Sequence, residues 1–313
     1  PLDEIREAAR RLRGIALHTP LVSFASPNPS QEIFLKLENL QPIGSFKLRG
    51  AGNAILSAPT EELAAGVFTA SAGNMAQGVS WIAQRFGIAC TAVVPDHAPA
   101  TKLAAIHRFG SNIIKVPFDE WWQILMTHQY AGCSGFFVHP VSDPAVIAGN
   151  GTIGLELFED EPEIETVLVP YGGGGLSTGI ASAIKALRPS VKVIACEVET
   201  AAPLAASLAA KKPVAIPYTP SFVDGIGGKS LLPEMWPMVS SLLDGSIVVS
   251  LAEIVSAIRN MAEQNRVIAE GAGAAPLAAA LSGKAPGEKI ACIVSGGNID
   301  SEKLAAILRN QIP

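Results

Sequence analysis

The chain has 313 residues and a formal net charge of −5, with 49% hydrophobic and 16% charged residues. This composition favours a large buried core over disorder, and an acidic chain without a basic stripe is not expected to bind nucleic acid. No apolar run approaches the roughly 20 residues of a membrane span, and the first residues read as a charged helix rather than a signal peptide. The four cysteines form no C-x-x-C pair, so we expect a cytoplasmic protein with no membrane partner.

The beginning of the chain predicts a helix, an extended stretch, a strand and a second helix. Apolar spacing indicates a helix over 3–13, and a proline makes 18–21 extended. A strand is expected at 33–38, and it leads into a helix that ends near Ser57.

The next block alternates short apolar strands with helices. The expected strands are 66–71, 90–95, 112–117 and 135–140, and the expected helices are 75–86, 100–109 and 119–130. This alternation is typical of parallel β/α units. We therefore predict a small domain at 57–144, inserted into a large domain formed by 1–56 and 145–313.

The rest of the chain repeats the β/α pattern. We expect a helix at 144–159, strands at 167–170, 191–197, 247–249 and 290–294, loops and short helices over 200–240, and a capping box at 250–253. No linker composition separates this part from the N-terminal segment, so the two are expected to share a sheet. The predicted fold class is α/β, with mostly parallel sheets flanked by helices.

The stretch 44–51, Gly-Ser-Phe-Lys-Leu-Arg-Gly-Ala, is the first candidate for chemistry. Ser45 is expected to be the N-cap of a helix whose first turn holds Lys47. The helix dipole and partial burial would both disfavour the charged amine. A neutral lysine is a nucleophile suited to a Schiff base with an aldehyde, although a surface lysine on an amphipathic helix is the ordinary alternative.

Four consecutive glycines, Gly172 to Gly175, follow a buried strand and open a helix. Their N–H groups can converge on an anion at the helix N-terminus, so this stretch predicts a phosphate site. Ser177 and Thr178 break the spacing of a dinucleotide-binding loop, and no lysine follows as in a Walker loop. A tight strand-to-helix turn is the remaining alternative.

Two further strand ends carry polar residues. The loop 71–75, Ser-Ala-Gly-Asn-Met, has free N–H groups for a carboxylate, or it is a simple capping loop. The stretch 295–298, Ser-Gly-Gly-Asn, lies where open α/β sheets bind ligands, or it is an ordinary turn. The five histidines share no metal-ligand spacing, and no serine-hydrolase elbow is present.

In this order, the four stretches resemble the fold-type II pyridoxal-phosphate enzymes, and in particular the serine/threonine dehydratase and serine racemase family. The likeness runs from Thr19-Pro20-Leu21 through 295–298. It implies two open, twisted, mostly parallel sheets in a tryptophan synthase β-like fold, with pyridoxal 5'-phosphate bound by the large domain.

The resemblance also implies roles for individual residues. Lys47 would form the Schiff base and later remove the Cα proton. Phe46 would pack against the pyridine ring, Asn74 would bond its 3-hydroxyl, and Ser295 would face its nitrogen. The phosphate would be held by Gly172, Gly173, Gly174, Gly175 and Leu176, and the substrate carboxylate by Ser71, Ala72, Gly73 and Asn74.

Two departures from the family pattern shape the prediction. Ala72 stands where serine racemases carry a serine that reprotonates the opposite face, which favours elimination over racemisation. Glu197 and Ala201 match the family's cation site, but its aspartate position is Pro203, so a monovalent ion or none is the alternative to a divalent cation.

The sequence thus predicts a dehydratase that converts a β-hydroxy amino acid such as L-serine or L-threonine to a 2-oxo acid and ammonia. The alternatives are a racemase or β-replacement enzyme of the same fold, and a non-catalytic amino-acid sensor. The family resemblance implies a homodimer.

Overall fold

The computed structural model describes residues 2–313, whose strands form two separate sheets. The larger sheet has the order β1-β2-β10-β7-β8-β9, and β1 pairs antiparallel to β2 while the other neighbours run parallel. Its strands are β1 Leu21–Phe24, β2 Glu32–Lys36, β7 Thr166–Pro170, β8 Lys192–Val198, β9 Gly245–Val249 and β10 Lys289–Ile293. The N-terminal strands therefore share a sheet with the C-terminal half, as expected.

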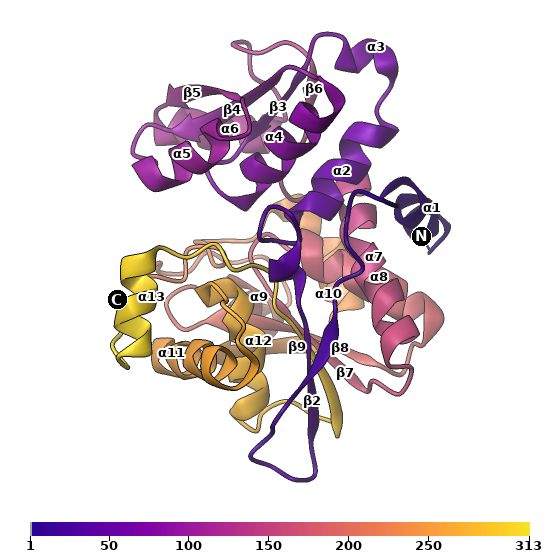
Figure 1. Ribbon diagram of the computed structural model, residues 1–313, viewed down its shortest axis with the longest axis vertical. Coiled ribbons are helices and arrows are strands. Elements are labelled where there is room, and N and C mark those ends of the chain that lie inside the picture. Colours follow the sequence, from indigo (N-terminus) through magenta and orange to yellow (C-terminus); the bar gives the residue numbers. More distant parts are fainter. Residues whose placement is uncertain (1) are drawn as a thin grey trace.

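The smaller sheet is parallel throughout, in the order β5-β4-β3-β6. Its strands are β3 Val67–Ala70, β4 Cys90–Pro95, β5 Asn112–Val116 and β6 Phe136–Phe137. The expected strand at 135–140 is thus only two residues long, because the chain turns at His139 into a loop. We call β3–β6 with their helices α4–α6 the small lobe, and β1, β2 and β7–β10 with α1, α7–α13 and their loops the large lobe; Figure 1 shows the small lobe above the large lobe, with α2 between them.

Helices connect the parallel strands and cover the sheets. Those of the small lobe are α4 Asn74–Phe86, α5 Ala100–His107 and α6 Phe118–Thr127. The other helices are α1 Leu2–Arg11, α2 Lys47–Ser57, α3 Thr60–Leu63, α7 Pro144–Asp160, α8 Gly175–Leu187, α9 Pro203–Ala210, α10 Trp236–Leu242, α11 Leu251–Asn260, α12 Gly271–Leu281 and α13 Ser301–Leu308, with short turns η1 Glu38–Leu40, η2 Pro233–Met235 and η3 Met261–Asn265. The capping box of Ser250 and Glu253 is present at the start of α11.

The central strands of the large sheet are buried on both faces. Along β7, Val167 and Val169 pack into the cluster beneath α8 and α10, while Leu168 packs into the opposite cluster with α11 and α12. Alternate residues of a strand point to opposite faces, so a continuous apolar run is what a doubly covered parallel sheet requires. The loops that follow the carboxyl ends of such strands are where open α/β sheets bind ligands.

A buried ion network fixes α2 against the large lobe. The Arg49 guanidinium donates to Glu38 at 2.7 and 2.8 Å and to Glu156 of α7 at 2.6 and 2.9 Å. Burial raises the pKa of the Glu38 carboxyl, but the charge and hydrogen bonds of Arg49 outweigh burial and hold that pKa below its usual value. Because α2 begins at Lys47, this network sets where the candidate nucleophile lies.

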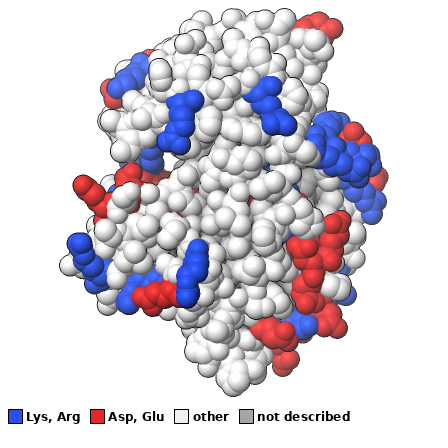
Figure 2. All heavy atoms as spheres, in the orientation of Figure 1, with Lys and Arg blue, Asp and Glu red and all other residues white. Residues whose placement is uncertain are grey.

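The surface and the helices also bear on possible partners. None of the helices in residues 2–313 is both long and apolar enough to cross a membrane. On the face shown in Figure 2, the basic side chains lie in separate small groups between broad uncharged areas.

Candidate active site

The predicted stretches meet between the two lobes, at the carboxyl ends of β3, β7 and β10. The lysine loop and the end of β10 are joined along their backbones. Phe46 N–H donates to Ser295 O at 2.9 Å, and Gly297 N–H donates to Gly44 O at 2.9 Å. Gly44 has φ +72°, and a Cβ there would lie 2.6 Å from the Asn298 amide oxygen, so this close approach requires glycine.

Lys47 is the first residue of α2 and is partly buried. Its Nζ donates to the Pro140 carbonyl at 2.7 Å and lies 5.2 Å from the centre of the Phe46 ring. Burial lowers the pKa of the Lys47 amine to about 8, and the charge of Glu270 opposes part of this shift. At that pKa a substantial fraction of the amine is neutral near physiological pH, as a nucleophile or base requires.

The expected N-cap at Ser45 is wrong. The helix N-cap is Phe46, no side chain caps it, and the buried Ser45 hydroxyl has no partner among the described residues. The reason is that the backbone at Ser45 already forms a β-bridge with Gly296, which extends the segment one residue further before the helix begins.

The glycine run has the shape of an anion cradle. Gly174 has φ +100°, and a Cβ at Gly173 or Gly175 would come within 2.5 Å of Val141 atoms. The N–H groups of Gly172, Gly173 and Gly174 donate to no protein acceptor in residues 2–313, and α8 begins at Gly175. Unpaired N–H groups at a helix N-terminus fit a phosphate group. Val141 follows Pro140, so the cradle and Lys47 contact the same short segment.

The loop after β3 begins α4 at Asn74. The Ser71 hydroxyl accepts from the Gly73 N–H at 3.2 Å, and a Cβ at Gly73 would meet no atom within 4 Å. The loop is therefore open on one side, as a carboxylate site needs. The Asn74 side chain is held at both ends, since its amide nitrogen donates to Glu270 Oε1 and its oxygen accepts from Asn298, both at 2.9 Å.

Glu270 belongs to the site and was missed by the sequence analysis. It is the N-cap residue of α12, only 9% of it is exposed, and it faces Asn74 and Lys47. Its local sequence, Ala-Glu-Gly-Ala, predicts nothing more than an ordinary helix start. No signal in the sequence marks it, because its contacts are with residues about 200 positions away.

The carboxylate oxygens of Glu197, part of the expected cation site with Ala201, have protein hydrogen-bond donors. The buried Glu197 carboxylate accepts the N–H groups of Leu204 and Ala205 at 2.8 Å each and the Ser246 hydroxyl at 2.6 Å. Pro203 begins α9 and offers no side-chain oxygen. A hard cation needs several free oxygen ligands, whereas this carboxylate accepts the N–H groups at a helix N-terminus. The reaction proposed below therefore uses no cation.

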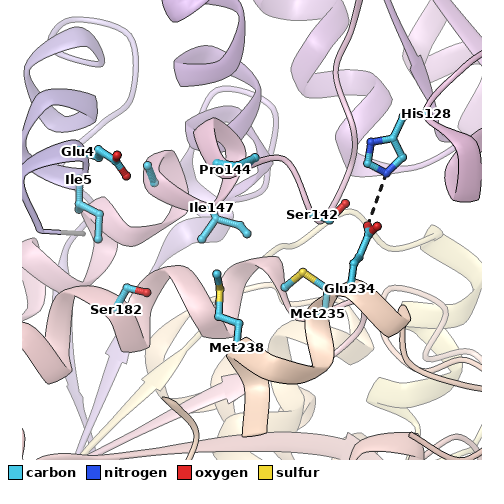
Figure 3. A pocket seen from close by; sticks show the side chains of 11 residues that line it. Glu4, Ile5, His128, Ser142, Pro144, Ile147, Ser182, Glu234, Met235 and Met238 are labelled. Carbon is cyan, nitrogen blue, oxygen red and sulfur yellow. Dashed lines mark ion pairs between the residues drawn. The ribbon is translucent and has the colours of Figure 1, made fainter. Parts of the chain in front are cut away.

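Two of the five histidines are brought together with an acid, next to the Pro140–Val141 segment that Lys47 and the glycine run contact. His128 stacks on His139 with ring centres 4.3 Å apart. The Nε2 atom of His128 lies 3.5 Å from a carboxylate oxygen of Glu234, and Figure 3 shows this ion pair. Ligand atoms of the three residues lie within 4.8 Å of one another. However, His139 Nδ1 accepts the Ser142 N–H at 2.8 Å and its Nε2 contacts Leu125 O at 3.2 Å. Both ring nitrogens of His139 therefore have protein partners, and we interpret the three residues as a packing contact. They lie beside a cavity of about 290 Å³.

Fold and site together define a pyridoxal-phosphate-dependent enzyme, and comparison with known proteins agrees. The family model described as pyridoxal-phosphate dependent enzyme matches residues 13–296. The chain belongs to this family, and the predicted fold class, family and cofactor are confirmed.

Individual members of the family show which activities are found among similar proteins. The chain is 42% identical to an L-threonine ammonia-lyase of Thermotoga maritima, over 98% of this chain and 78% of the relative. It is 37% identical to a serine racemase of Oryza sativa, over 96% and 91%. The solved structure of maize serine racemase superposes with a TM-score of 0.91 at 36% identity, covering 98% of this chain and 96% of the other.

Proposed function

We propose that this protein is an ammonia-lyase that removes water from a β-hydroxy amino acid, L-threonine or L-serine; the enamine so formed is then hydrolysed by water to a 2-oxo acid and ammonia. The observation that carries the proposal is the Lys47 amine, whose pKa is lowered to about 8 and which lies beside an anion cradle. Relatives named L-threonine ammonia-lyase and L-threonine dehydratase support the reaction type.

The cofactor would be held by the residues described above. Gly172 to Gly175 and Leu176 would bind its phosphate, Phe46 would pack on its ring, and Asn74 and Ser295 would contact its hydroxyl and nitrogen. When bound, pyridoxal phosphate supplies an electron sink next to the substrate Cα.

The chain's own groups would then direct the proton. The Lys47 amine takes the Cα proton, and the Pro140 carbonyl, 2.7 Å away, holds that amine in reach when it is free. The N–H groups of 71–74 at the start of α4 would bind the substrate carboxylate. Ala72 has no proton to return to the opposite face, so loss of the β-hydroxyl is favoured.

The test incubates the purified holoenzyme with L-threonine and L-serine and measures 2-oxo acid release. We expect turnover with a visible absorption band that borohydride erases and that Lys47→Ala lacks. Turnover that survives in Lys47→Ala, or a cofactor-loaded protein that releases no 2-oxo acid from either substrate, would overturn the proposal.

A racemase is the second candidate, because a serine racemase is among the relatives at 37% identity. Chiral analysis of recovered serine separates the two activities. We expect no D-serine from the native chain and measurable D-serine from Ala72→Ser. D-serine formed by the native chain at a rate comparable to 2-oxo acid would favour the racemase.

Three coarser proposals accompany the reaction. We infer a two-domain organisation, with 57–144 inserted between 1–56 and 145–313, a homodimer, and a cytoplasmic location. Limited proteolysis near Ser57 and Pro144, light scattering of the purified protein, and cell fractionation test these in turn.

A further inference from the structure

The Asn74 side chain connects the two lobes through the middle of the site. Asn74 begins α4 in the small lobe, whereas both of its side-chain partners, Glu270 and Asn298, belong to the large lobe. Asn298 Nδ2 also donates to Ile43 O at 2.9 Å, so both N–H groups of the Asn298 amide have an acceptor. The amide orientation of Asn74 is therefore set from both ends, with its N–H₂ group toward Glu270.

A glycine makes room for the Glu270 carboxylate at this place. A Cβ at Gly296 would lie 2.5 Å from Glu270 Oε1. The Glu270 backbone N–H donates to Gly296 O at 3.0 Å, which anchors the residue to the end of β10. The carboxylate thus lies against the residue that follows Ser295, the predicted partner of the cofactor ring nitrogen.

A second cross-lobe contact bears on the same carboxylate. Lys102 of α5 in the small lobe forms an ion pair with Asp224 of the large lobe at 3.0 Å, and Lys303 lies 3.9 Å from Asp224. The charged groups that face Glu270 are Asp224, Lys102 and Lys47. Asp224 opposes the charge of Glu270, and the two lysines support it.

We propose that Glu270 is a positioning residue that aims the Asn74 amide at the cofactor ring, and that Lys102 keeps Glu270 in its charged, accepting form. This inference rests on the proposed function, in which Asn74 contacts the ring hydroxyl. A neutral Glu270 accepts the Asn74 N–H more weakly than a carboxylate does, so the contact depends on proton uptake.

The electrostatics place this proton uptake near neutral pH. Burial raises the pKa of Glu270 to about 7, Asp224 raises it as well, and the Asn74 hydrogen bond, Lys102 and Lys47 oppose the shift. Buried carboxyls without a direct ion pair behave in this way. Separation of Lys102 from Asp224 and Glu270 would leave Lys303, 3.9 Å from Asp224, as the remaining lysine paired with Asp224, and would push Glu270 toward its neutral form.

The main experiment titrates the visible band of the holoenzyme between about pH 5.5 and 9. We expect the native protein to show a transition near pH 7 that is absent in Glu270→Gln, which keeps an acceptor for Asn74 but cannot ionise. Glu270→Ala, which keeps no acceptor, should bind pyridoxal phosphate at least about tenfold more weakly than Glu270→Gln. Lys102→Met should move the transition to higher pH, and the matched control Lys115→Met, a lysine on β5 with an exposed side chain, should not.

The apo protein gives a second measurement that needs no activity. In a Lys47→Ala background, which removes an amine that lowers the Glu270 pKa, that pKa lies above the native value of about 7, so Glu270 contributes stability at low pH that is lost as pH rises through this higher pKa. The fall in melting temperature from pH 5 to pH 8 should therefore be larger in the Lys47→Ala protein than in the double variant that also carries Glu270→Gln.

The outcomes separate this inference from the proposed function. A band that forms in the native protein but titrates identically in Glu270→Gln overturns the positioning role. An unshifted transition in Lys102→Met overturns the part played by the cross-lobe ion pair. A native protein that forms no band removes the proposed function and this inference with it.

Discussion

Lys47 shows how one side chain is tuned by its surroundings. Its Nζ has a carbonyl partner, Pro140 O at 2.7 Å, and no carboxylate within ion-pair distance among the described residues. A carbonyl accepts a hydrogen bond from the amine without fixing its charge, while burial disfavours the ammonium form. The residue is therefore prepared to exchange protons near neutral pH, which an exposed lysine is not.

This gives a pH prediction at the residue scale. Because the Lys47 amine has its pKa lowered from 10.5 to about 8, the neutral base becomes scarcer as pH falls below that value. We expect the rate at which the apo protein forms a Schiff base with pyridoxal phosphate to fall about tenfold per pH unit below that value and to level off above it, because only the neutral amine attacks the aldehyde. Stopped-flow mixing of apo protein with pyridoxal phosphate checks this, and a rate that is flat from pH 6 to 9 would contradict it.

Two elements place the site, the β7–α8 loop and the start of α2. The loop can hold its open N–H groups only because glycine permits φ +100° at Gly174 and close contact with Val141. Helix α2 depends instead on the buried ion network of Arg49. The β7–α8 loop is fixed by glycines, which have no side chain. Helix α2 is fixed by the Arg49 guanidinium, which pairs with two carboxylates.

Gly175→Ala tests the loop. A Cβ there would lie 2.5 Å from the Val141 carbonyl oxygen, which is backbone and cannot rotate away. We expect the affinity for pyridoxal phosphate to drop by at least about tenfold, which corresponds to the loss of one charged-group hydrogen bond. Gly228→Ala is the matched control, since its nearest atom would be 3.7 Å away, and fluorescence titration should find its affinity unchanged.

Arg49→Met tests the network under α2. The change leaves the buried Glu38 carboxylate without its ion-pair partner, with only the neutral donors Thr19 and Gln41, so we expect a loss of about 3–5 kcal/mol in the free energy of unfolding. Urea denaturation measures this loss. Arg6→Met, which removes an exposed ion pair with Asp3, serves as the control and should unfold at the native midpoint. A midpoint for Arg49→Met equal to the control would show that the network contributes little.

The whole molecule is two lobes that meet at the site. They touch through Asn74 with Glu270, through Lys102 with Asp224 and through His128 with Glu234. Helix α2 lies between them in Figure 1 and contacts both α4 and α7. A ligand bound between the lobes therefore stabilises the folded molecule as a whole.

Removal of the cofactor tests this coupling. Binding to the folded state alone stabilises it by about 2.7 kcal/mol at a ligand concentration of 100 times Kd. We expect resolved apo protein to melt at a lower temperature in one transition and to recover on addition of pyridoxal phosphate. Recovery confined to one of two separate transitions would show that the lobes unfold independently.

Features that depend on residues close in the sequence could be predicted, whereas features that depend on residues far apart in the sequence could not. The β/α alternation and the capping box at Ser250 are confirmed because each depends on neighbours in sequence. Ser45 was misread as an N-cap because its bridge to Gly296 joins distant segments. The strand at 135–140 was overestimated for a related reason, since β6 pairs along β3 for only two residues.

The sequence by itself indicated the family and the cofactor through short motifs that resemble known enzymes, and most of the β/α elements through local periodicity. Tertiary structure alone decided that Glu270 faces Asn74, that Glu197 closes α9, and that Lys47 bonds Pro140. Burial, pKa and hydrogen-bond partner are properties of what surrounds a side chain. In this fold, those surroundings come from strands and loops that lie far apart in the chain.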